Sequence, residues 1–268
     1  MDRIENIETG ISRLTEFIRD FVNSTTLKKI VLGLSGGVDS SLSAALAVKA
    51  VGAENVLGMI MPYQSSSSES EKDARAVAEV LGIKAEKIDI SPMIDAYFRG
   101  QKDIGAVRLG NKCARERMAV LFDIAAREKA LVQGTSNKTE ICLGYATWYG
   151  DAACSYNPLG GLYKCEIWMM ATRLGVPREI VEKKPTADLW PGQTDEGEIG
   201  LSYTLADKIL YEIVERDVRS LNELKETGAS EKEIELVIDR MNQFTFKRSL
   251  PATDLLDGKP IPEKIILE

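Results

Sequence analysis

The pattern of hydrophobic and polar residues predicts helices that alternate with short strands. Near the start, apolar residues recur every three or four positions, the spacing of one helix face; they are Ile4, Ile7, Ile11, Leu14, Ile18 and Phe21. Short apolar or alternating runs predict strands at 28–34, 56–61, 84–90 and 130–133. Between these runs, helices are predicted at 40–51, 69–81 and 114–129, and Gly82 is expected to end the second of them.

This alternation predicts an α/β fold with a parallel sheet flanked by helices. Ligands of such sheets bind beyond the carboxyl ends of the strands, which places the expected site in the loops 34–41 and 134–140. Later helical patterns at 164–174, 201–216 and 231–241 predict a helical C-terminal lobe. We find no long linker and predict one domain over 1–268, divided into an N-terminal helix (1–24), a core (25–190) and the lobe (191–268).

Composition and charge exclude several classes of protein. The 268 residues carry a net charge of −7, which argues against broad binding to nucleic acid. No apolar run approaches the roughly 20 residues of a membrane-spanning helix, and the first residues lack the layout of a signal peptide. We therefore expect a cytoplasmic protein with no membrane partner.

The residue types that are absent narrow the chemistry further. There is no histidine, so Ser-His-Asp and Cys-His catalysis and histidine-ligated metal sites are excluded. None of the four cysteines forms a C-x-x-C motif, which argues against zinc-ribbon and thioredoxin-like sites. We expect reduced cysteines, and hard cations bound by oxygen ligands remain possible.

A glycine-rich motif between the first predicted strand and the next helix points to phosphate binding. Glycines let backbone N–H groups converge on an anion, and the start of the helix adds its dipole. The sequence is neither a Walker loop nor a dinucleotide fingerprint. Asp39 either caps the helix or holds a cation that bridges to phosphate. The predicted ATP-binding loop comprises Gly33, Leu34, Ser35, Gly36, Gly37, Val38, Asp39 and Ser40.

The segment S-G-G-V-D-S at 35–40 resembles the pyrophosphate loop of N-type ATP pyrophosphatases, which split ATP into AMP and pyrophosphate. Further blocks follow in order: RLGNKCARERM (108–118), GTSNKTE (134–140), GYATWYGDAACSYNPLGGLYK (144–164), KPTADL (184–189), GQTDEGEIGLSY (192–203) and Lys247-Arg248. Together they are similar to ammonia-dependent NAD synthetases over about residues 5–252. The resemblance implies an adenine-nucleotide α-hydrolase-like, Rossmann-like fold and a homodimer. It also implies conversion of deamido-NAD, ATP and ammonia to NAD, AMP and pyrophosphate through an acyl-adenylate.

The resemblance also implies roles for single residues. Asp39 and Glu140, on loops at the same edge of the sheet, are the expected Mg²⁺ ligands. Thr135, Thr186 and Lys164 are expected to contact ATP, with Lys164 on the phosphates and counted as catalytic. The alternatives are an ordinary surface lysine at Lys164 and a solvated first-turn helix residue at Glu140.

Other matched positions concern the second substrate and ammonia. Arg115 and Lys247 are expected to bind deamido-NAD, with a surface ion pair as the alternative for Arg115. Asp151 is expected to orient ammonia or remove a proton from it, because ammonium is not nucleophilic and a desolvated carboxylate can accept a proton. Three positions depart from the family pattern, so their family roles are not carried over: Trp148, Ser155 and Phe246.

Three alternatives remain open at this stage. The chain could be an ATP pyrophosphatase with a different carboxylate or carbonyl acceptor, or a non-catalytic nucleotide-binding module. The apolar stripe of the N-terminal helix predicts a homodimer built partly on that helix, although the same stripe could pack on its own chain.

Overall fold

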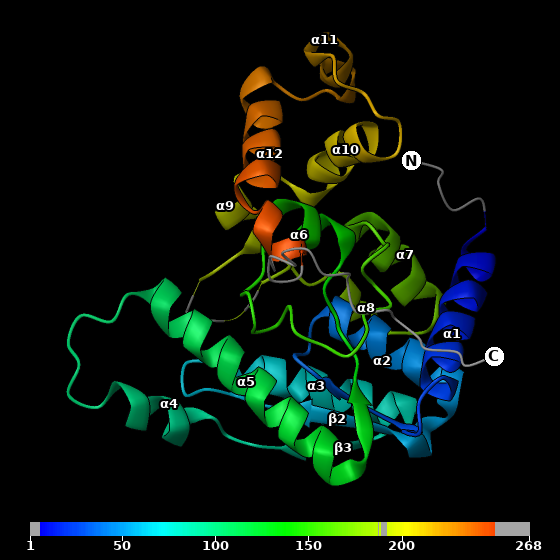
Figure 1. Ribbon diagram of the computed structural model, residues 1–268, viewed down its shortest axis with the longest axis vertical. Helices are drawn as coiled ribbons and strands as arrows, with labels where there is room; N and C mark the ends of the chain where they lie inside the picture. Colours follow the sequence, from blue (N-terminus) through cyan, green and yellow to red (C-terminus); the bar gives the residue numbers. More distant parts are fainter. Residues whose placement is uncertain (1–5, 187, 189–191, 250–268) are drawn as a thin grey trace, which may run out of the picture.

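The computed structural model describes residues 6–186, 188 and 192–249. Ile4 of the apolar stripe, Ala187 and Leu189 of the KPTADL block, and the end of the predicted lobe (250–268) lie outside the described residues. Figure 1 shows an α/β part in which helices surround a sheet, and a second, helical part that stands above it.

The sheet has four parallel strands in the order β3-β2-β1-β4. They are β1 (Lys29–Gly33), β2 (Val56–Ile60), β3 (Lys84–Lys87) and β4 (Ala130–Val132). Ile30 of β1 lies opposite Val56 on one side and Leu131 on the other. The chain adds β2 and β3 on one side of β1 and then crosses to add β4 on the other, so the strand order reverses between β1 and β4. Open sheets of this kind bind ligands at such a reversal.

Helices cover both faces of this sheet. Ile30 and Leu32 point to the face covered by α1 (Ile7–Asn23), α2 (Val38–Val51), α3 (Ser68–Leu81) and α7 (Lys164–Arg173), where they join one hydrophobic cluster. Val31, between them, points to the face covered by α4 (Ser91–Phe98) and α5 (Ala106–Glu128), in a second cluster. Because every second residue of a strand faces the same way, this alternation confirms a strand buried on both faces and the predicted α/β fold.

The C-terminal part has a hydrophobic cluster of its own. It is built on α6 (Lys138–Leu143), α9 (Asp195–Ile199), α10 (Tyr203–Val214), α11 (Leu221–Leu224) and α12 (Glu231–Gln243). The remaining short elements are α8 (Arg178–Val181), η1 (Ala53–Asn55), η2 (Lys225–Thr227) and η3 (Thr245–Arg248). The predicted helices at 164–174, 201–216 and 231–241 are confirmed, whereas the division of the chain into 1–24, 25–190 and 191–268 stays a prediction.

The apolar stripe of α1 packs on the chain's own core. Ile11 and Ile18 are 1% and 0% exposed, and Ile7, Leu14 and Phe21 pack against the same cluster. The interpretation of this stripe as a surface for a second subunit is therefore wrong, because its side chains already fill the space above α2 and α7. Phe17, 43% exposed, is the large apolar residue that α1 leaves open.

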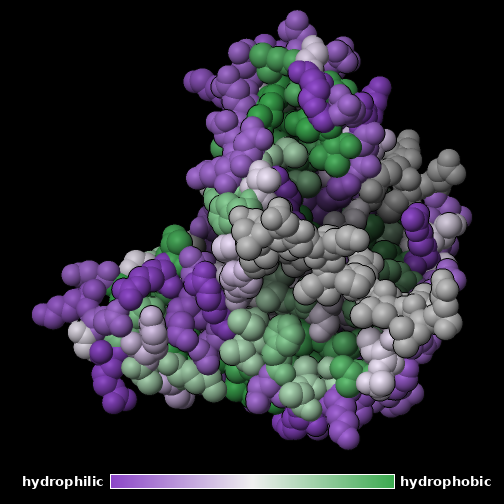
Figure 2. Space-filling model, viewed as in Figure 1, coloured by the Kyte–Doolittle hydropathy of each residue, from purple (hydrophilic) through white to green (hydrophobic). Residues whose placement is uncertain are grey.

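Figure 2 shows hydrophilic residues along the outer edges of both parts of the molecule, with hydrophobic residues gathered between them in the upper part and in the lower middle. Within the described ranges, no helix is both long and apolar enough to cross a bilayer. The four cysteines are free thiols, two of them buried.

Candidate active site

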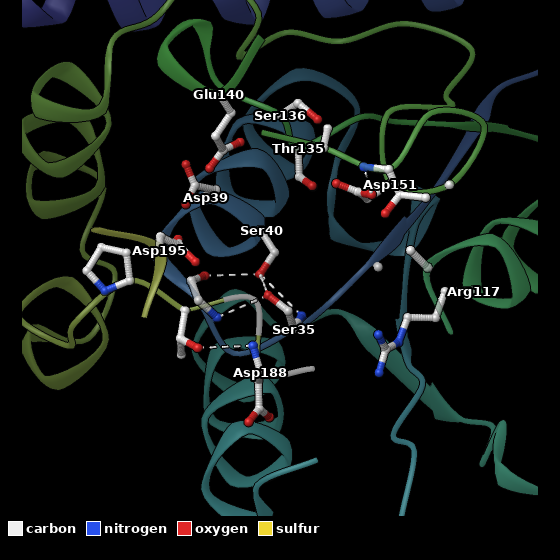
Figure 3. A pocket seen from close by; sticks show the side chains of 18 of the residues that line it. Ser35, Asp39, Ser40, Arg117, Thr135, Ser136, Glu140, Asp151, Asp188 and Asp195 are labelled. Carbon is white, nitrogen blue, oxygen red and sulfur yellow. Dashed lines mark hydrogen bonds between the residues drawn. The ribbon is translucent and has the colours of Figure 1, made fainter. Parts of the chain in front are cut away.

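A cavity of about 670 Å³ opens at the carboxyl ends of β1, β2 and β4. Its walls are formed by the loops after these strands, by one face of α5, and by residues of 144–147, 150–153 and 183–186 together with Asp188 (Figure 3). The two loops that the sequence predicted to meet, 34–41 and 134–140, lie on the same side of it, because β1 and β4 are neighbours in the sheet. The volume is that of a small-molecule site.

The glycine-rich loop forms an open N-terminus for α2. Gly37 precedes the helix, and within the described ranges no side-chain hydrogen bond caps its start. The loop is held by its own hydroxyls: Ser35 and Ser40 Oγ lie 3.0 Å apart, and Ser40 Oγ donates to the Gly37 carbonyl at 3.0 Å. Uncapped N–H groups and the helix dipole attract anions, so this geometry is compatible with phosphate binding, which stays a prediction.

Three charged side chains from separate elements meet beside this loop. Lys164, at the start of α7 and only 1% exposed, forms an ion pair with Asp39 Oδ2, and its Nζ lies 3.9 Å from Glu140 Oε1. Asn137 Nδ2 donates to Asp39 Oδ1 at 2.9 Å. Lys164 is therefore not the surface lysine of the alternative interpretation. The ion pair joins the start of α7 to the segment after β1, and the Asn137–Asp39 hydrogen bond joins the segments after β1 and β4.

Glu140 stabilises the start of α6 and also lies close to Lys164. It completes a capping box at the start of α6, since its Oε2 accepts from Asn137 N at 3.1 Å while Asn137 Oδ1 accepts from Glu140 N. Burial and then the charge of Asp39 raise the pKa of the Glu140 carboxyl, and Lys164 only partly opposes this. Burial alone would lower the pKa of Lys164, but Asp39 and Glu140 outweigh it and raise that pKa.

Asp195 is a cavity residue to which we assigned no role from the sequence. It is 6% exposed and accepts hydrogen bonds from the hydroxyls of Tyr145 at 3.0 Å and Tyr203 at 3.1 Å. Burial raises the pKa of its carboxyl, and Lys164 counteracts the shift. Its position in the block GQTDEGEIGLSY was the signal available, but its neighbours come from α10 and from the loop after α6.

Two arginines of α5 lie differently with respect to the cavity: Arg117 lines it and Arg115 does not. The residues of α5 that face the cavity follow helical spacing: Val107, Asn111, Ala114, Arg117, Met118 and Leu121. Arg115 is exposed, is not among the lining residues, and donates through Nε to the Trp148 carbonyl at 3.2 Å. A contact between Arg115 and substrate therefore stays a prediction. Arg117, which we did not single out, lines the cavity, and this helical phase could have identified it.

Asp151 and Lys247 organise the loop that closes one end of the cavity. Asp151 Oδ1 accepts from Thr147 N at 2.8 Å, and Lys247 Nζ donates to the carbonyls of Gly144 and Ala146, each at 2.7 Å. Both residues line the cavity. Although the Asp151 side chain is open to the cavity, the surrounding protein raises the pKa of its carboxyl by desolvation, which the Thr147 hydrogen bond partly offsets.

The two threonines expected to contact ATP also line the cavity. Thr135 lies in the loop after β4, next to the charged cluster, and Figure 3 shows its side chain in the cavity. The Thr186 hydroxyl donates to the Gln193 carbonyl at 2.8 Å and accepts from Asp188 N, so it stabilises the loop in which it lies.

Comparisons with known proteins identify the family to which this arrangement belongs. The family model described as NAD synthase matches residues 10–251. This chain belongs to the NAD synthase family. It is 48% identical to the NH(3)-dependent NAD(+) synthetase of Fusobacterium nucleatum, across 92% of this chain and 95% of that protein. The corresponding protein of Trichlorobacter lovleyi is 46% identical, across 96% and 94% of the two chains.

Two solved structures of similar proteins agree with this assignment to the NAD synthase family. An NMN synthetase from Francisella tularensis has a TM-score of 0.83 at 32% identity, covering 93% of this chain and 98% of that one. An NH3-dependent NAD synthetase from Campylobacter jejuni, in complex with nitrate, has a TM-score of 0.79 at 33% identity, covering 92% and 98%. The predicted family and fold are thereby confirmed.

The three positions that depart from the family pattern lie outside the cavity wall. Trp148 packs edge-to-face on Phe246, with ring centroids 5.2 Å apart. Ser155 Oγ accepts from Val132 N at 3.1 Å and so fastens the loop to β4. In this member of the NAD synthase family, these side chains pack against the protein's own loops.

Proposed function

We propose that this protein amidates deamido-NAD with ammonia at the expense of ATP, giving NAD, AMP and pyrophosphate. One observation carries the proposal: an uncapped helix start, a buried Lys164–Asp39 ion pair and Glu140 meet at the strand-order reversal of a sheet. Family membership and relatives named NH(3)-dependent NAD(+) synthetase support it. A non-catalytic nucleotide-binding module would not need carboxylates beside its phosphate loop.

We propose that Asp39 and Glu140 hold Mg²⁺ when ATP is bound. The two carboxylates already share a cation, the Lys164 ammonium, and carboxylate oxygens are the ligands that Mg²⁺ prefers. Within the described part of the chain, no three acidic or sulfur side chains cluster as a complete metal site. This fits a metal bound by one or two carboxylates and by substrate phosphates. Mg²⁺ bound there would neutralise charge on the phosphates.

The reaction needs two displacements in one cavity. First, an oxygen of the nicotinate carboxylate attacks the α-phosphate, the bond to pyrophosphate breaks, and an acyl-adenylate forms. Then ammonia attacks the acyl carbon, and the bond to AMP breaks. Charge develops on the α-phosphate and the leaving pyrophosphate, so positioned donors lower the barrier. We assign these donors to the loop 33–40, Thr135, Thr186 and Lys164.

We assign the orientation and deprotonation of ammonia to Asp151, and the binding of deamido-NAD to Arg115 and Lys247. Asp151 lines the cavity at the end opposite Glu140 in Figure 3, and its raised pKa suits it to accept a proton. Lys247 lines the same end. Arg115 lies beside the cavity wall and donates to the Trp148 carbonyl. To contact Arg115, part of the bound deamido-NAD would have to extend out of the cavity, past Trp148.

A second candidate function is synthesis of NMN by amidation of the corresponding mononucleotide acid. The similarity to the Francisella tularensis NMN synthetase favours it. Adenylation and amidation would be the same, and the acid substrate would be shorter.

The test is pyrophosphate release by the purified chain with ATP, Mg²⁺ and ammonium, with deamido-NAD, its mononucleotide counterpart, or neither. We expect release that depends on deamido-NAD, and no release when glutamine replaces ammonium. A preference for the mononucleotide would establish the second candidate. Release without any acid substrate, or no release at all, would contradict both.

We also propose a homodimer formed by a single-domain chain. The family resemblance supports it, as does the exposed Phe17 on α1, whose ring lies 6.4 Å from that of Phe21 and 6.3 Å from that of Tyr156. The cytoplasmic location stays a prediction.

A further inference from the structure

Arg117 places a guanidinium in the cavity wall opposite the charged cluster. Its Nε donates to the Met61 carbonyl, just beyond β2, at 2.9 Å, and one terminal nitrogen lies 3.5 Å from Ser66 Oγ. Figure 3 shows Arg117 on the side of the cavity where Asp151 lies, with Ser35 and Ser40 between it and Asp39. These two contacts use Nε and one terminal nitrogen; the other terminal nitrogen forms no hydrogen bond with the described residues.

Arg117 differs in its partners from Lys164 and Lys183, which also line the cavity. Those two have carboxylate partners, Asp39 and Asp73, whereas no carboxylate of the described residues forms an ion pair with Arg117. Among the residues that the structure describes, its hydrogen-bond acceptors are two neutral oxygens. The guanidinium has five N–H donors, so most of them lack a partner within the described chain. Burial lowers the pKa of the group, and the more distant Asp188 and Asp151 only partly offset this.

A half-buried guanidinium without a counter-ion is stabilised when an anion arrives. We propose that Arg117 binds the oxyanion of the reacting groups: the carboxylate of the acid substrate, the α-phosphate of ATP, or both during adenylation. Both are anionic oxygen groups that match the guanidinium fork. This inference rests on the proposed function, to which it adds a catalytic residue.

The chemistry explains why a cation is needed at this place. In adenylation a negatively charged carboxylate must approach a negatively charged α-phosphate. The carboxylate–phosphorus bond forms while the bond to pyrophosphate breaks, and the electron pair leaves with pyrophosphate. Arg117 takes no proton and forms no bond; it offsets the repulsion between the two oxyanions. Asp39 and Glu140, on the other side of the phosphate loop, cannot do this, since they are acidic.

The test compares Arg117→Gln and Arg117→Lys with the wild type in acid-dependent pyrophosphate release. We expect kcat/KM for the acid substrate to fall about 10- to 100-fold in Arg117→Gln, the usual effect of losing a hydrogen bond to a charged group. Arg117→Lys should recover part of the loss because it restores the charge. The binding constant for ATP then identifies the anion: unchanged binding indicates the carboxylate, and binding weakened in parallel indicates the α-phosphate.

Two control variants separate this role from a structural one. Arg127→Gln removes the same charge from the exposed end of α5, where Arg127 pairs with Glu86 and Glu128, and should leave kinetics unchanged. Ser66→Ala removes the more distant of the two oxygens that contact Arg117 and leaves the guanidinium bonded to the Met61 carbonyl. If Ser66→Ala matches the loss in Arg117→Gln, or if Arg117→Gln is unimpaired, the inference is overturned. Absence of acid-dependent release in the wild type would instead overturn the proposed function.

Discussion

Gly36 lies where the glycine-rich loop (33–40) passes very close to α3. Its φ is +79°, and a Cβ there would lie 2.3 Å from the backbone oxygen of Ser70. We expect Gly36→Ala to weaken ATP binding and lower the melting temperature, because backbone on both sides must shift. Thermal unfolding with and without ATP measures both effects. Gly161→Ala is the matched control, since nothing lies within 4 Å of its added methyl; an equal loss there would contradict the prediction.

Asp39 combines stability with activity. Lys164 is 1% exposed and pairs with Asp39, so Asp39→Asn leaves a buried ammonium with only the more distant Glu140 carboxylate, 3.9 Å away. We expect the single substitution to abolish most turnover and to cost up to about 3–5 kcal/mol of unfolding free energy, the usual effect of breaking a buried pair.

The double variant Asp39→Asn/Lys164→Met distinguishes the two effects. Removing both charges should restore much of the melting temperature without restoring turnover, because the buried ammonium is gone and the Glu140 carboxyl, whose pKa burial raises, can take up a proton. Near-normal turnover in Asp39→Asn would mean that Asp39 only supports the loop.

Asp151 should produce a characteristic dependence on pH. Desolvation raises the pKa of its carboxyl, so the ionised form that accepts a proton is lost, as pH falls, at a higher pH than for an ordinary aspartate. We expect Asp151→Asn to reduce kcat by about 10²–10⁴ at neutral pH. The deficit should shrink as pH rises, because more ammonia then arrives already deprotonated. A deficit independent of pH would indicate that Asp151 only shapes its loop.

At the scale of elements, Asp207 of α10 ties together the two helices that carry Glu140 and Lys164. Its buried carboxylate accepts from Thr139 Oγ1 at 2.5 Å and from Cys165 N at 2.8 Å, while Thr139 Oγ1 accepts from Lys164 N at 3.1 Å. The C-terminal helices thus fix the starts of α6 and α7.

We expect Asp207→Asn to raise the KM for ATP and to lower the melting temperature. The two carboxylate oxygens of Asp207 each accept one hydrogen bond, whereas an amide has only one oxygen that can accept. Thr139→Val, which breaks the same link, should add little further loss in the double variant. Asp239→Asn, an equal change of charge on the exposed face of α12, should leave both quantities unchanged. Steady-state kinetics and thermal unfolding check this, and additive losses would contradict a shared link.

The elements that carry a long hydrophobic period were predictable, and the short ones were not. All four strands and the long helices follow from spacing, although α5 begins eight residues before its predicted start. α6 and α4 have too few turns to show a period, but the N-K-T-E of α6 is a capping-box sequence that could have revealed it. The meeting of the loops after β1 and β4 follows from the parallel sheet. Asp195 and Tyr203 could not be placed, because their positions depend on packing between distant helices.

For the whole molecule, the predicted dimer needs a surface other than the apolar stripe. Phe17 is exposed beside Phe21 and Tyr156, and burying it against a partner would gain about 2 kcal/mol per subunit. We expect Phe17→Glu to lower the apparent mass in light scattering toward that of one chain, and Val80→Glu, an exposed apolar position on α3, to leave it unchanged. A wild-type chain that is monomeric at micromolar concentration would contradict the proposal.

The Lys164 ammonium lies where an incoming divalent ion would have to be accommodated. Because it is tethered to the chain, its effective concentration at Asp39 is far above that of free magnesium in solution. A metal ion without nucleotide would therefore compete with Lys164 for the carboxylates, and the displaced ammonium would be left buried without an anionic partner. In the proposed site nucleotide would change that balance, because its phosphates would give the ammonium a new partner while Asp39 and Glu140 bound the metal. Titration calorimetry should accordingly detect weak or no binding of Mg²⁺ alone and tight binding of the Mg²⁺–ATP complex, so that the two enter as one ligand.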